Sequence, residues 1–325
     1  MTIKEIAQAL GISTSTVSKA LNNATDVSEV TRNRVNSYAQ SVGFSLRGSA
    51  TQKRICILFE NMDSHNNFQV GYPVLTGFQQ AANAYHYEVV VEHCTDSNAP
   101  DLKELCRENN FCAVMIVGTK LDSPLMKELE TIDIPVMLMD SYVKNPKVSS
   151  ISSDNINSVA AIVSHLIEKG HRKIGFLGGD QASIVTRERF AGYLIGLTEG
   201  GIDYNSDYVR YGTYTEASGR FIASAFTKTD VTAVVCASDL IAIGLINGFR
   251  DLGVNVPADI SVSGFDDLDI ARYFSPALTT VRQDFISLGV NAFTLLRQAI
   301  KGNKTKRVTI HTEPVFRAST GPVKK

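Results

Sequence analysis

The short motifs that mark many enzyme sites do not occur in this sequence. There is no phosphate-binding loop of the form G-x-x-x-x-G-K-S/T, no G-x-S-x-G nucleophile turn, no H-E-x-x-H metal motif and no C-x-x-C pair. The six histidines are scattered along the chain. We therefore expect neither catalysis nor a bound metal or cofactor.

Cysteine and long apolar runs are also scarce. The five cysteines are odd in number and lie mostly in apolar runs such as ICILF, which predicts reduced core thiols. No stretch approaches the roughly 20 apolar residues that a membrane span needs. The first residues are amphipathic rather than continuously apolar, unlike a signal peptide. We expect a cytoplasmic protein with no membrane contact.

Charge is unevenly distributed along the 325 residues. The net charge is −1, but residues 1–54 hold seven basic and three acidic side chains, a net charge of +4, which leaves −5 for the remainder. The length predicts two or three compact units. A basic head on an acidic body is typical of a unit that seeks phosphates, although +4 alone is weak evidence.

Three short helices are predicted in the first fifty residues. In the first, apolar residues fall at i, i+3, i+4 and i+7 (Ile3, Ile6, Ala7 and Leu10), Thr2 and Glu5 form a capping box, and Gly11 ends the helix. Ser13 is the expected cap of a second helix over residues 14–22. Its polar, outward residues are Thr14, Ser15, Ser18, Lys19 and Asn22. A third helix follows Ser28, ends at Gly43 and is expected to bury Val30, Val35, Tyr38, Ala39 and Val42.

Two helices joined by a tight turn, with a third across them, form the helix-turn-helix arrangement, in which the second helix enters the DNA major groove. The alternative is a generic three-helix bundle with a polar surface. The small hydroxyl side chains and single lysine of the second helix favour DNA binding, because such groups approach base edges and phosphates closely.

The run TIKEIAQALGISTSTVSKALNN resembles the N-terminal domain of the lactose-repressor/galactose-repressor family, whose members open T-I-x-D-V-A and carry V-S-x-x-T-V-S-x-x-L-N. This resemblance implies that Thr14, Ser15 and Lys19 approach base edges. It places Thr16, Asn22 and Arg32 near phosphates. Ser18 lies on the same outward face and belongs to the predicted DNA-binding set.

The linker departs from the family pattern. Members usually continue with Y-x-P-N-x-x-A-R-x-L, a hinge helix that inserts a leucine into the minor groove, but here Gly43-Phe44 leads directly into SLRGSA. Leu46 is the candidate for the surviving wedge. The alternative is that the helix is too short to form. We expect minor-groove insertion to be weakened and residues 45–53 to act as a short tether.

From residue 54 onward, continuous apolar runs of strand length alternate with helical patterns. The runs are RICILF, YEVVVEH, CAVMIVG, IPVMLMD, KIGFLGG, TAVVCAS and ISVSGF. Such runs predict an α/β fold of doubly wound parallel sheets covered on both faces. About 270 residues exceed what one such sheet needs, so two lobes are expected, with a ligand bound between them at the strands' carboxyl ends.

Polar side chains follow several of these strands at the place where ligands bind in such folds. They are Glu60, Asp140, Ser238 with Asp239, and Asp266 with Asp267. Each alone is slightly better explained as a helix cap or turn residue. Together, acidic acceptors with an arginine and an aromatic face are what a polyol needs.

The body resembles the same family in RERFAGYLIGL and in GVNVPADISVSGFDDLDIARYFSPALTTVRQDF. The resemblance implies a periplasmic-binding-protein-like domain and effector contacts by Asp140, Arg189, Asp266 and Phe285. Ser238 stands where an asparagine is common, and Glu60 where a small polar residue is common. A glutamate in the pocket could favour an amine-bearing ligand over a neutral sugar.

The resemblance also implies the domain boundaries. We expect a helix-turn-helix domain over 1–44, a linker over 45–53 and an effector-binding and dimerisation domain over 54–321. Its N-lobe comprises 54–152 and 285–310, and its C-lobe 153–284 and 311–321. A homodimer would bind a palindromic double-stranded operator with half-sites about 34 Å apart.

The predicted function is therefore a DNA-binding transcriptional regulator, in most similar proteins a repressor, whose operator affinity is set by a small molecule such as a sugar. The alternatives are a sugar-binding protein or an enzyme on a related α/β fold. The missing catalytic motifs argue against the enzyme, and the N-terminal helices and the lack of a signal-peptide pattern argue against the sugar-binding protein.

Overall fold

The structure is a computed structural model that describes residues 2–21, 24, 26–42, 53–62 and 67–324. The chain divides into two compact units, residues Met1–Lys53 and Arg54–Lys325. Each unit is described by itself. The linker residues up to 52, with Leu46, lie outside the described residues.

The first unit consists of α1 (Ile3–Leu10), α2 (Thr14–Leu21) and α3 (Glu29–Ser41). The predicted capping box is present, because the Thr2 hydroxyl accepts from the Glu5 amide and the Glu5 carboxylate accepts from the Thr2 amide. Gly11 ends α1 with a φ of 65°, a left-handed conformation that glycine adopts without strain. The Ser13 hydroxyl accepts from the Thr16 amide at 3.0 Å and so caps α2.

The three helices close over one small core. Its buried members are Ile6, Ala7, Val17, Ala20, Val27, Val35 and Ala39. The prediction that α3 buries Val30 is wrong, because this side chain is 79% exposed. At roughly 100° per residue, Val30 lies well off the stripe that Val35 and Ala39 form on the same helix.

The second unit contains a six-stranded sheet in the order β11-β5-β4-β3-β1-β2. Its strands are β1 (Lys53–Glu60), β2 (Tyr87–Cys94), β3 (Phe111–Val117), β4 (Val136–Met139), β5 (Val148–Ser153) and β11 (Arg307–Ile310). The pairs β1–β3, β3–β4, β4–β5 and β5–β11 are parallel. The order reverses direction between β1 and β3, and such a reversal leaves a crevice beyond the strand ends.

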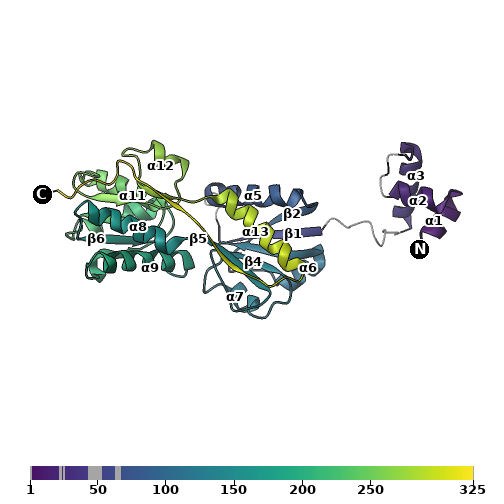
Figure 1. The fold of residues 1–325 in the computed structure, drawn as a ribbon, viewed down its shortest axis with the longest axis horizontal. Coiled ribbons are helices and arrows are strands. Elements are labelled where there is room, and N and C mark those ends of the chain that lie inside the picture. The colour runs from purple at the N-terminus through teal and green to yellow at the C-terminus, as the bar shows by residue number, and fades with distance from the viewer. Residues whose placement is uncertain (1, 22–23, 25, 43–52, 63–66, 325) are drawn as a thin grey trace. The chain divides into compact units, whose positions relative to one another are not determined.

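Helices cover both faces of this sheet, as its apolar strands require. On one face lie α5 (Tyr72–Asn83), which follows the short π-helical turn η1 (Asn67–Gly71), and α13 (Phe285–Ile300). On the other face lie α6 (Leu102–Asn109) and α7 (Pro124–Leu129). Figure 1 shows the two layers above and below the strands.

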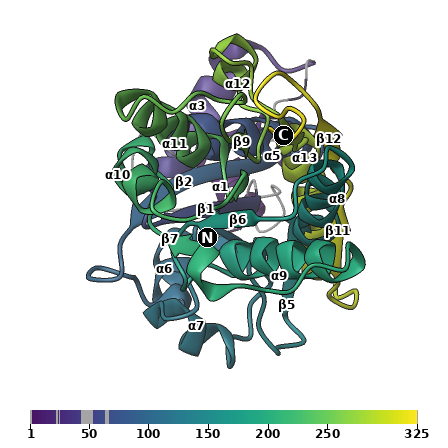
Figure 2. The same ribbon diagram turned by 90° about the vertical axis from the view of Figure 1, so that its left-hand side faces the viewer.

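A four-stranded parallel sheet forms the second lobe, in the order β7-β6-β8-β9. Its strands are β6 (Ile174–Gly178), β7 (Val209–Tyr211), β8 (Ala233–Cys236) and β9 (Ser261–Ser263). Helix α8 (Asn155–Glu168) pairs with α9 (Ile184–Glu199), and α10 (Glu216–Phe226) pairs with α11 (Asp239–Asp251), one pair on each face (Figure 2). The short helices η2 (Ser206–Tyr208) and α12 (Asp269–Tyr273) complete the lobe.

The chain passes between the two sheets three times. It crosses from β5 into α8, from β10 (Thr280–Arg282) into α13, and from β11 into β12 (Glu313–Val315). Strands β10 and β12 pair antiparallel. The first two crossings each end at an aspartate that caps the next helix, Asp154 for α8 and Asp284 for α13, so the helices start at defined points.

Close packing of α5 on α13 depends on two glycines that face each other's helix. A Cβ on Gly77 would lie 2.1 Å from the Ile286 carbonyl oxygen, and one on Gly289 would lie 2.0 Å from the Val74 carbonyl oxygen. Neither backbone can yield without moving its helix. The two helices therefore pack more closely than a side chain at either glycine position would allow.

Replacing Gly77 with alanine should destabilise the body by about 1 to 3 kcal/mol, because the added methyl group forces α5 and α13 apart. The measurement is the urea unfolding midpoint followed by circular dichroism. Gln80→Ala, an exposed change on the same helix, is the matched control. Equal midpoints for the two variants would contradict this packing argument.

Candidate functional site

The predicted DNA-reading residues lie on α2 as expected for an exposed recognition helix. Thr14, Ser15 and Lys19 are exposed, while Thr16 and Ser18 are half-buried. Residues at positions 14, 15, 18 and 19 share one face of a helix. The predicted contact Asn22 lies outside the described residues.

Two basic side chains of this unit already have partners. The Lys19 ammonium lies 2.5 Å from the Asp26 carboxylate, and this hydrogen bond lowers the pKa of Asp26. The Arg32 guanidinium donates to the carbonyl oxygens of Ala24 at 2.9 Å and Val27 at 3.2 Å. Arg32 therefore holds the connection between α2 and α3, a structural role that the sequence does not reveal.

The second unit contains a cavity of about 210 Å³ at the carboxyl ends of the strands. Five of the six predicted effector contacts line it: Asp140, Arg189, Ser238, Asp266 and Phe285. They come from both lobes, after β4, on α9, after β8, after β9 and at the start of α13. The ends of several strands therefore meet at this cavity, as expected.

Arg189 is the central cation of the cavity. It is 4% exposed, and its Nε donates to the Asn155 side-chain oxygen at 2.9 Å. Its Nη1 donates to the Ala237 carbonyl oxygen and lies 3.6 Å from the Asp266 carboxylate. The guanidinium carbon lies 3.6 Å from the centre of the Phe265 ring, a cation–π contact.

Asp266 connects this cation to the segment that crosses between the lobes. Its Oδ1 accepts from the Gln283 side-chain amide at 2.7 Å, and the Gln283 oxygen accepts from Ser153 at the end of β5 at 2.5 Å. Burial raises the pKa of Asp266 to about 6, although Arg189 and Gln283 oppose the rise. The acid therefore faces both the cavity and the hinge.

Asp140 is the least compensated acid of the cavity. Burial raises its pKa to about 7, with Glu188 and Asp266 adding to the rise and Arg189 and the Ser153 amide opposing it. Its backbone is left-handed, with a φ of 55°. Apart from that amide, its carboxylate meets no hydrogen-bond donor among the described residues, so it is available to accept from a ligand.

Ser238 and Glu60 differ in what they do. Ser238 lines the cavity and also caps α11, since its hydroxyl accepts from the Ile241 amide at 3.3 Å. Glu60 is fully buried and is not among the described residues that line the cavity. Its carboxylate accepts a hydrogen bond from Ser123, which opposes the pKa rise that burial causes. The next residue, Asn61, lines the cavity instead.

Sequence reasoning missed eight polar residues of the described cavity wall. They are Asn61, Gln69, Thr119, Lys120, Asp180, Ser183, Tyr214 and Gln283. Asp180 follows β6 and its two glycines, so the rule that found the other strand ends could have found it. Gly179 leaves room for the Tyr214 ring, which would lie 2.2 Å from an added Cβ. The aromatic lining is thus Phe285 from one lobe and Tyr214 from the other.

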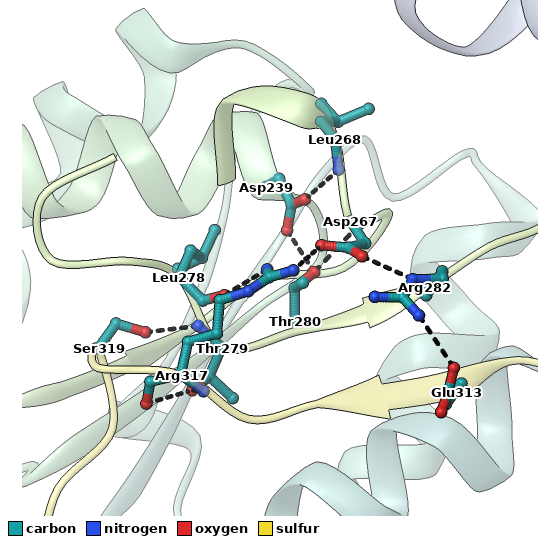
Figure 3. A network of polar contacts seen from close by, with 10 residues as sticks. All are labelled: Asp239, Asp267, Leu268, Leu278, Thr279, Thr280, Arg282, Glu313, Arg317 and Ser319. Atoms are coloured by element: carbon teal, nitrogen blue, oxygen red, sulfur yellow. Dashed lines mark hydrogen bonds and ion pairs between the residues drawn. The ribbon is translucent and has the colours of Figure 1, made fainter. Parts of the chain in front are cut away.

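A second polar network holds the hinge beside the cavity (Figure 3). Asp267 accepts from Arg317 at 2.5 Å and from Arg282 at 2.8 Å, and Arg282 also pairs with Glu313 at 3.1 Å. These contacts join the end of β9 to β10 and β12. Adjacent aspartates therefore have separate roles, since Asp266 lines the cavity and Asp267 secures the crossing strands.

Asp239, at the start of α11, is a buried structural carboxyl. Its Oδ2 accepts from the Leu268 amide at 2.8 Å and its Oδ1 accepts from the Thr280 hydroxyl at 2.5 Å. Burial raises the pKa of Asp239 to about 8, and the charge of Asp266 adds to the rise.

Among the described residues, no group of three His, Cys, Asp or Glu side chains is placed to hold a metal ion. No helix in the described part of the chain is long and apolar enough to cross a membrane.

Comparison with known proteins agrees with this arrangement over both units. Residues 2–45 match the family described as bacterial regulatory proteins, lacI family, and residues 163–320 match a periplasmic binding protein-like domain. The HTH-type transcriptional repressor PurR of Photobacterium profundum is 30% identical over 329 residues, which cover 96% of each chain. The chain belongs to the lacI family of bacterial regulatory proteins.

Other relatives extend the same picture. The repressor CytR of Escherichia coli is 26% identical, over 93% of this chain and 90% of its own. A transcriptional regulator CelR–cellobiose complex is 26% identical with a TM-score of 0.74, covering 98% of this chain and 99% of that one. A lac repressor dimer bound to operator and the anti-inducer ONPF has a TM-score of 0.77 at 23% identity, over 99% of both chains, and shows the shared fold.

This lacI-family chain is thus a DNA-binding transcriptional repressor with a ligand-binding domain, and not an enzyme. The predicted fold class, a helix-turn-helix unit followed by a parallel-sheet α/β body, is confirmed.

The raised pKa of Asp140 makes stability depend on pH. A carboxyl with a folded-state pKa of about 7 makes its full contribution to the stability of the body when the pH is below its ordinary pKa near 3.8. This contribution is lost as the pH rises from there through 7. From pH 5 to pH 8, the wild type should therefore lose on the order of 1 to 3 kcal/mol more unfolding free energy than Asp140→Asn. Urea unfolding at the two pH values measures the difference.

Asp133→Asn, a change at an exposed carboxylate, is the control and should follow the wild type. If Asp140→Asn also lost as much stability as the wild type, Asp140 would not be a poorly compensated acid.

Proposed function

We propose that this repressor binds a palindromic operator as a homodimer and that a small polyhydroxylated molecule, a sugar or sugar derivative, occupies the cavity and changes operator affinity. The protein would act in the cytoplasm, where the operator is. The observation that carries the effector class is the composition of the cavity wall. Two acidic acceptors, Asp140 and Asp266, line it together with the buried donor Arg189, and Phe285 and Tyr214 supply its aromatic side chains.

Each part of this wall suits a polyol. Carboxylates accept hydrogen bonds from vicinal hydroxyls, a guanidinium donates to hydroxyl or ring oxygens, and an aromatic face packs on the apolar C–H face of a sugar ring. Glu60 was the sequence-based reason to expect an amine-bearing ligand. Because Glu60 is bonded to Ser123 outside the described lining, that reason no longer applies.

The cavity can control DNA binding because its walls belong to both lobes. A ligand that binds one arrangement of the lobes better than another shifts the equilibrium between them, and by reciprocity DNA shifts ligand affinity by the same factor. In a dimer, such a shift changes the spacing of two recognition helices, which must match half-sites about 34 Å apart.

A thermal-shift screen tests the effector class. The panel is D-glucose, D-galactose, D-ribose, cellobiose, glucosamine, glucose 6-phosphate and adenosine, since a ligand at 100 times its Kd adds about 2.7 kcal/mol to stability. We expect a neutral sugar to raise the Tm of the wild type. Asp140→Asn should abolish the shift, because the amide NH2 that replaces one carboxylate oxygen donates hydrogen bonds and cannot accept them from a hydroxyl.

Arg189→Ala should likewise abolish the ligand response and leave operator affinity nearly unchanged. It also removes the partner of Asn155 and Asp266, so the isosteric Asp140→Asn is the cleaner variant. A Tm shift by adenosine alone, or an equal sugar shift in Asp140→Asn, would contradict the proposed effector class.

Lys19 tests the reading of DNA by α2. With an operator selected from a random duplex library, Lys19→Ala should cost about 1 to 3 kcal/mol and relax preference at one base pair. Asp26→Asn should tighten binding, because it frees Lys19 and removes a carboxylate near phosphates. Fluorescence anisotropy on single-base operator variants measures both. A uniform loss across all variants for Lys19→Ala would indicate a phosphate contact instead of base reading.

A further inference from the structure

One ion pair of the cavity wall joins the two lobes far from the hinge. The Lys120 ammonium, which follows β3 in the six-stranded lobe, lies 2.7 Å from the Oδ2 of Asp180, which follows β6 in the four-stranded lobe. Beside it, the Leu121 amide donates to the Ala182 carbonyl oxygen at 3.0 Å. Two loops that are 60 residues apart in sequence thus meet through a side-chain and a backbone contact.

Both loops hold these groups in place. The other oxygen of Asp180, Oδ1, accepts from the Ala182 amide at 2.9 Å, and the Asp180 carbonyl oxygen accepts from the Ser183 amide at 3.1 Å. On the other side, the Lys120 carbonyl oxygen accepts from the Ser123 amide at 3.2 Å. Asp180 therefore offers one oxygen to its own turn and one to the opposite lobe.

Because this contact lies away from the β5 and β11 crossings, a given rotation of the lobes changes its length more than that of contacts beside those crossings. In the sheet order β11-β5-β4-β3, the strand before Lys120 lies two strands from the β5 crossing and three from the β11 crossing. At about 4.8 Å per strand, β3 lies about 10 Å from β5 and about 14 Å from β11. Another ion pair between the lobes, Arg307 with Glu188 at 2.9 Å, begins on β11 itself and so lies beside a crossing.

We propose that Lys120 and Asp180 form a latch that sets how firmly the two lobes close over the cavity. The proposal rests on the proposed function, in which closure of the lobes is linked to ligand binding. Both residues line the cavity, so the pair ties the two lobes together at the wall that a bound ligand contacts. The pair thereby tunes ligand residence without contacting DNA.

The electrostatics favour a contact that opens and closes again. Each side chain is about one-third exposed, with values of 33% for Lys120 and 36% for Asp180, so the attraction is partly screened and the pair is modest in strength. The hydrogen bond raises the pKa of Lys120 and lowers that of Asp180, so both stay charged near neutral pH. Asp96 and Asp122 also stabilise the Lys120 charge.

Spin-label distances between the lobes test the latch without any ligand. In a Cys112→Ser background the remaining cysteines are buried, and labels are placed at the exposed positions of Lys127→Cys on α7 and Ala217→Cys on α10. The full-length protein should show one dominant short distance at low salt. Lys120→Met and Asp180→Asn should each move a severalfold larger fraction of molecules to longer distances.

Three comparisons separate a latch from a general structural effect. The control Lys173→Met breaks the 2.5 Å pair with Asp230, which lies within one lobe, and should leave the distances unchanged. The conservative variant Lys120→Arg, which keeps a positive charge beside Asp180, should retain the short distance. Raising NaCl to 1 M should open the wild type but leave Lys120→Met unaffected.

Wild-type distances in Lys120→Met would overturn the proposal, as would a Lys120→Arg variant as open as Lys120→Met. Because no ligand is added, these outcomes are independent of the sugar screen. A screen without sugar hits would refute the effector class and leave the distance measurements to decide the latch.

Discussion

The guanidinium of Arg189 is buried, and a buried cation without partners costs several kcal/mol, so the surrounding chain must supply acceptors from every side. Those acceptors come from Asn155 at the start of α8, from Ala237 after β8 and from Asp266 after β9. Asn155 stands at the first crossing between the lobes. One side chain thereby joins the four-stranded sheet, a hinge segment and the cavity wall.

The same polar atoms serve the hinge and the cavity, and this sharing is what makes the body suited to switching. Asp266 faces the cavity, yet its carboxylate also holds Gln283, which in turn holds Ser153 at the end of β5. A ligand that hydrogen-bonds Asp266 or Arg189 would thus contact groups that also hold two crossings. The neighbouring Asp267 is paired with Arg282 and Arg317 and so joins the end of β9 to the crossing strands.

Much of the fold could be predicted because its elements have strong local signals. The buried strands are continuous apolar runs, and α1 begins and ends at a capping box and a left-handed glycine. Five strands were missed: β5, whose sequence VSSISS has four serines and no continuous apolar run, and the short strands β7, β10, β11 and β12. Val30 shows that an apolar residue cannot be assigned to the core from its type alone. Its angular position on α3 lies off the buried stripe, so its side chain remains in solvent.

The site was predictable where it depends on strand ends and unpredictable where it depends on side-chain direction or on the approach of the lobes. Glu60 is the last residue of β1 and faces Ser123, whereas Asn61 follows it with a left-handed φ of 54° and lines the cavity. Which residue of such a pair faces the ligand depends on where the strand ends, and a polar pair gives no hydrophobic signal for that point. Lys120 and Asp180 belong to separate sheets, and only the three crossings bring them together. We expect contacts of that kind to contribute to the proposed coupling between ligand and fold, because an ion pair between the lobes is lost when the lobes move apart.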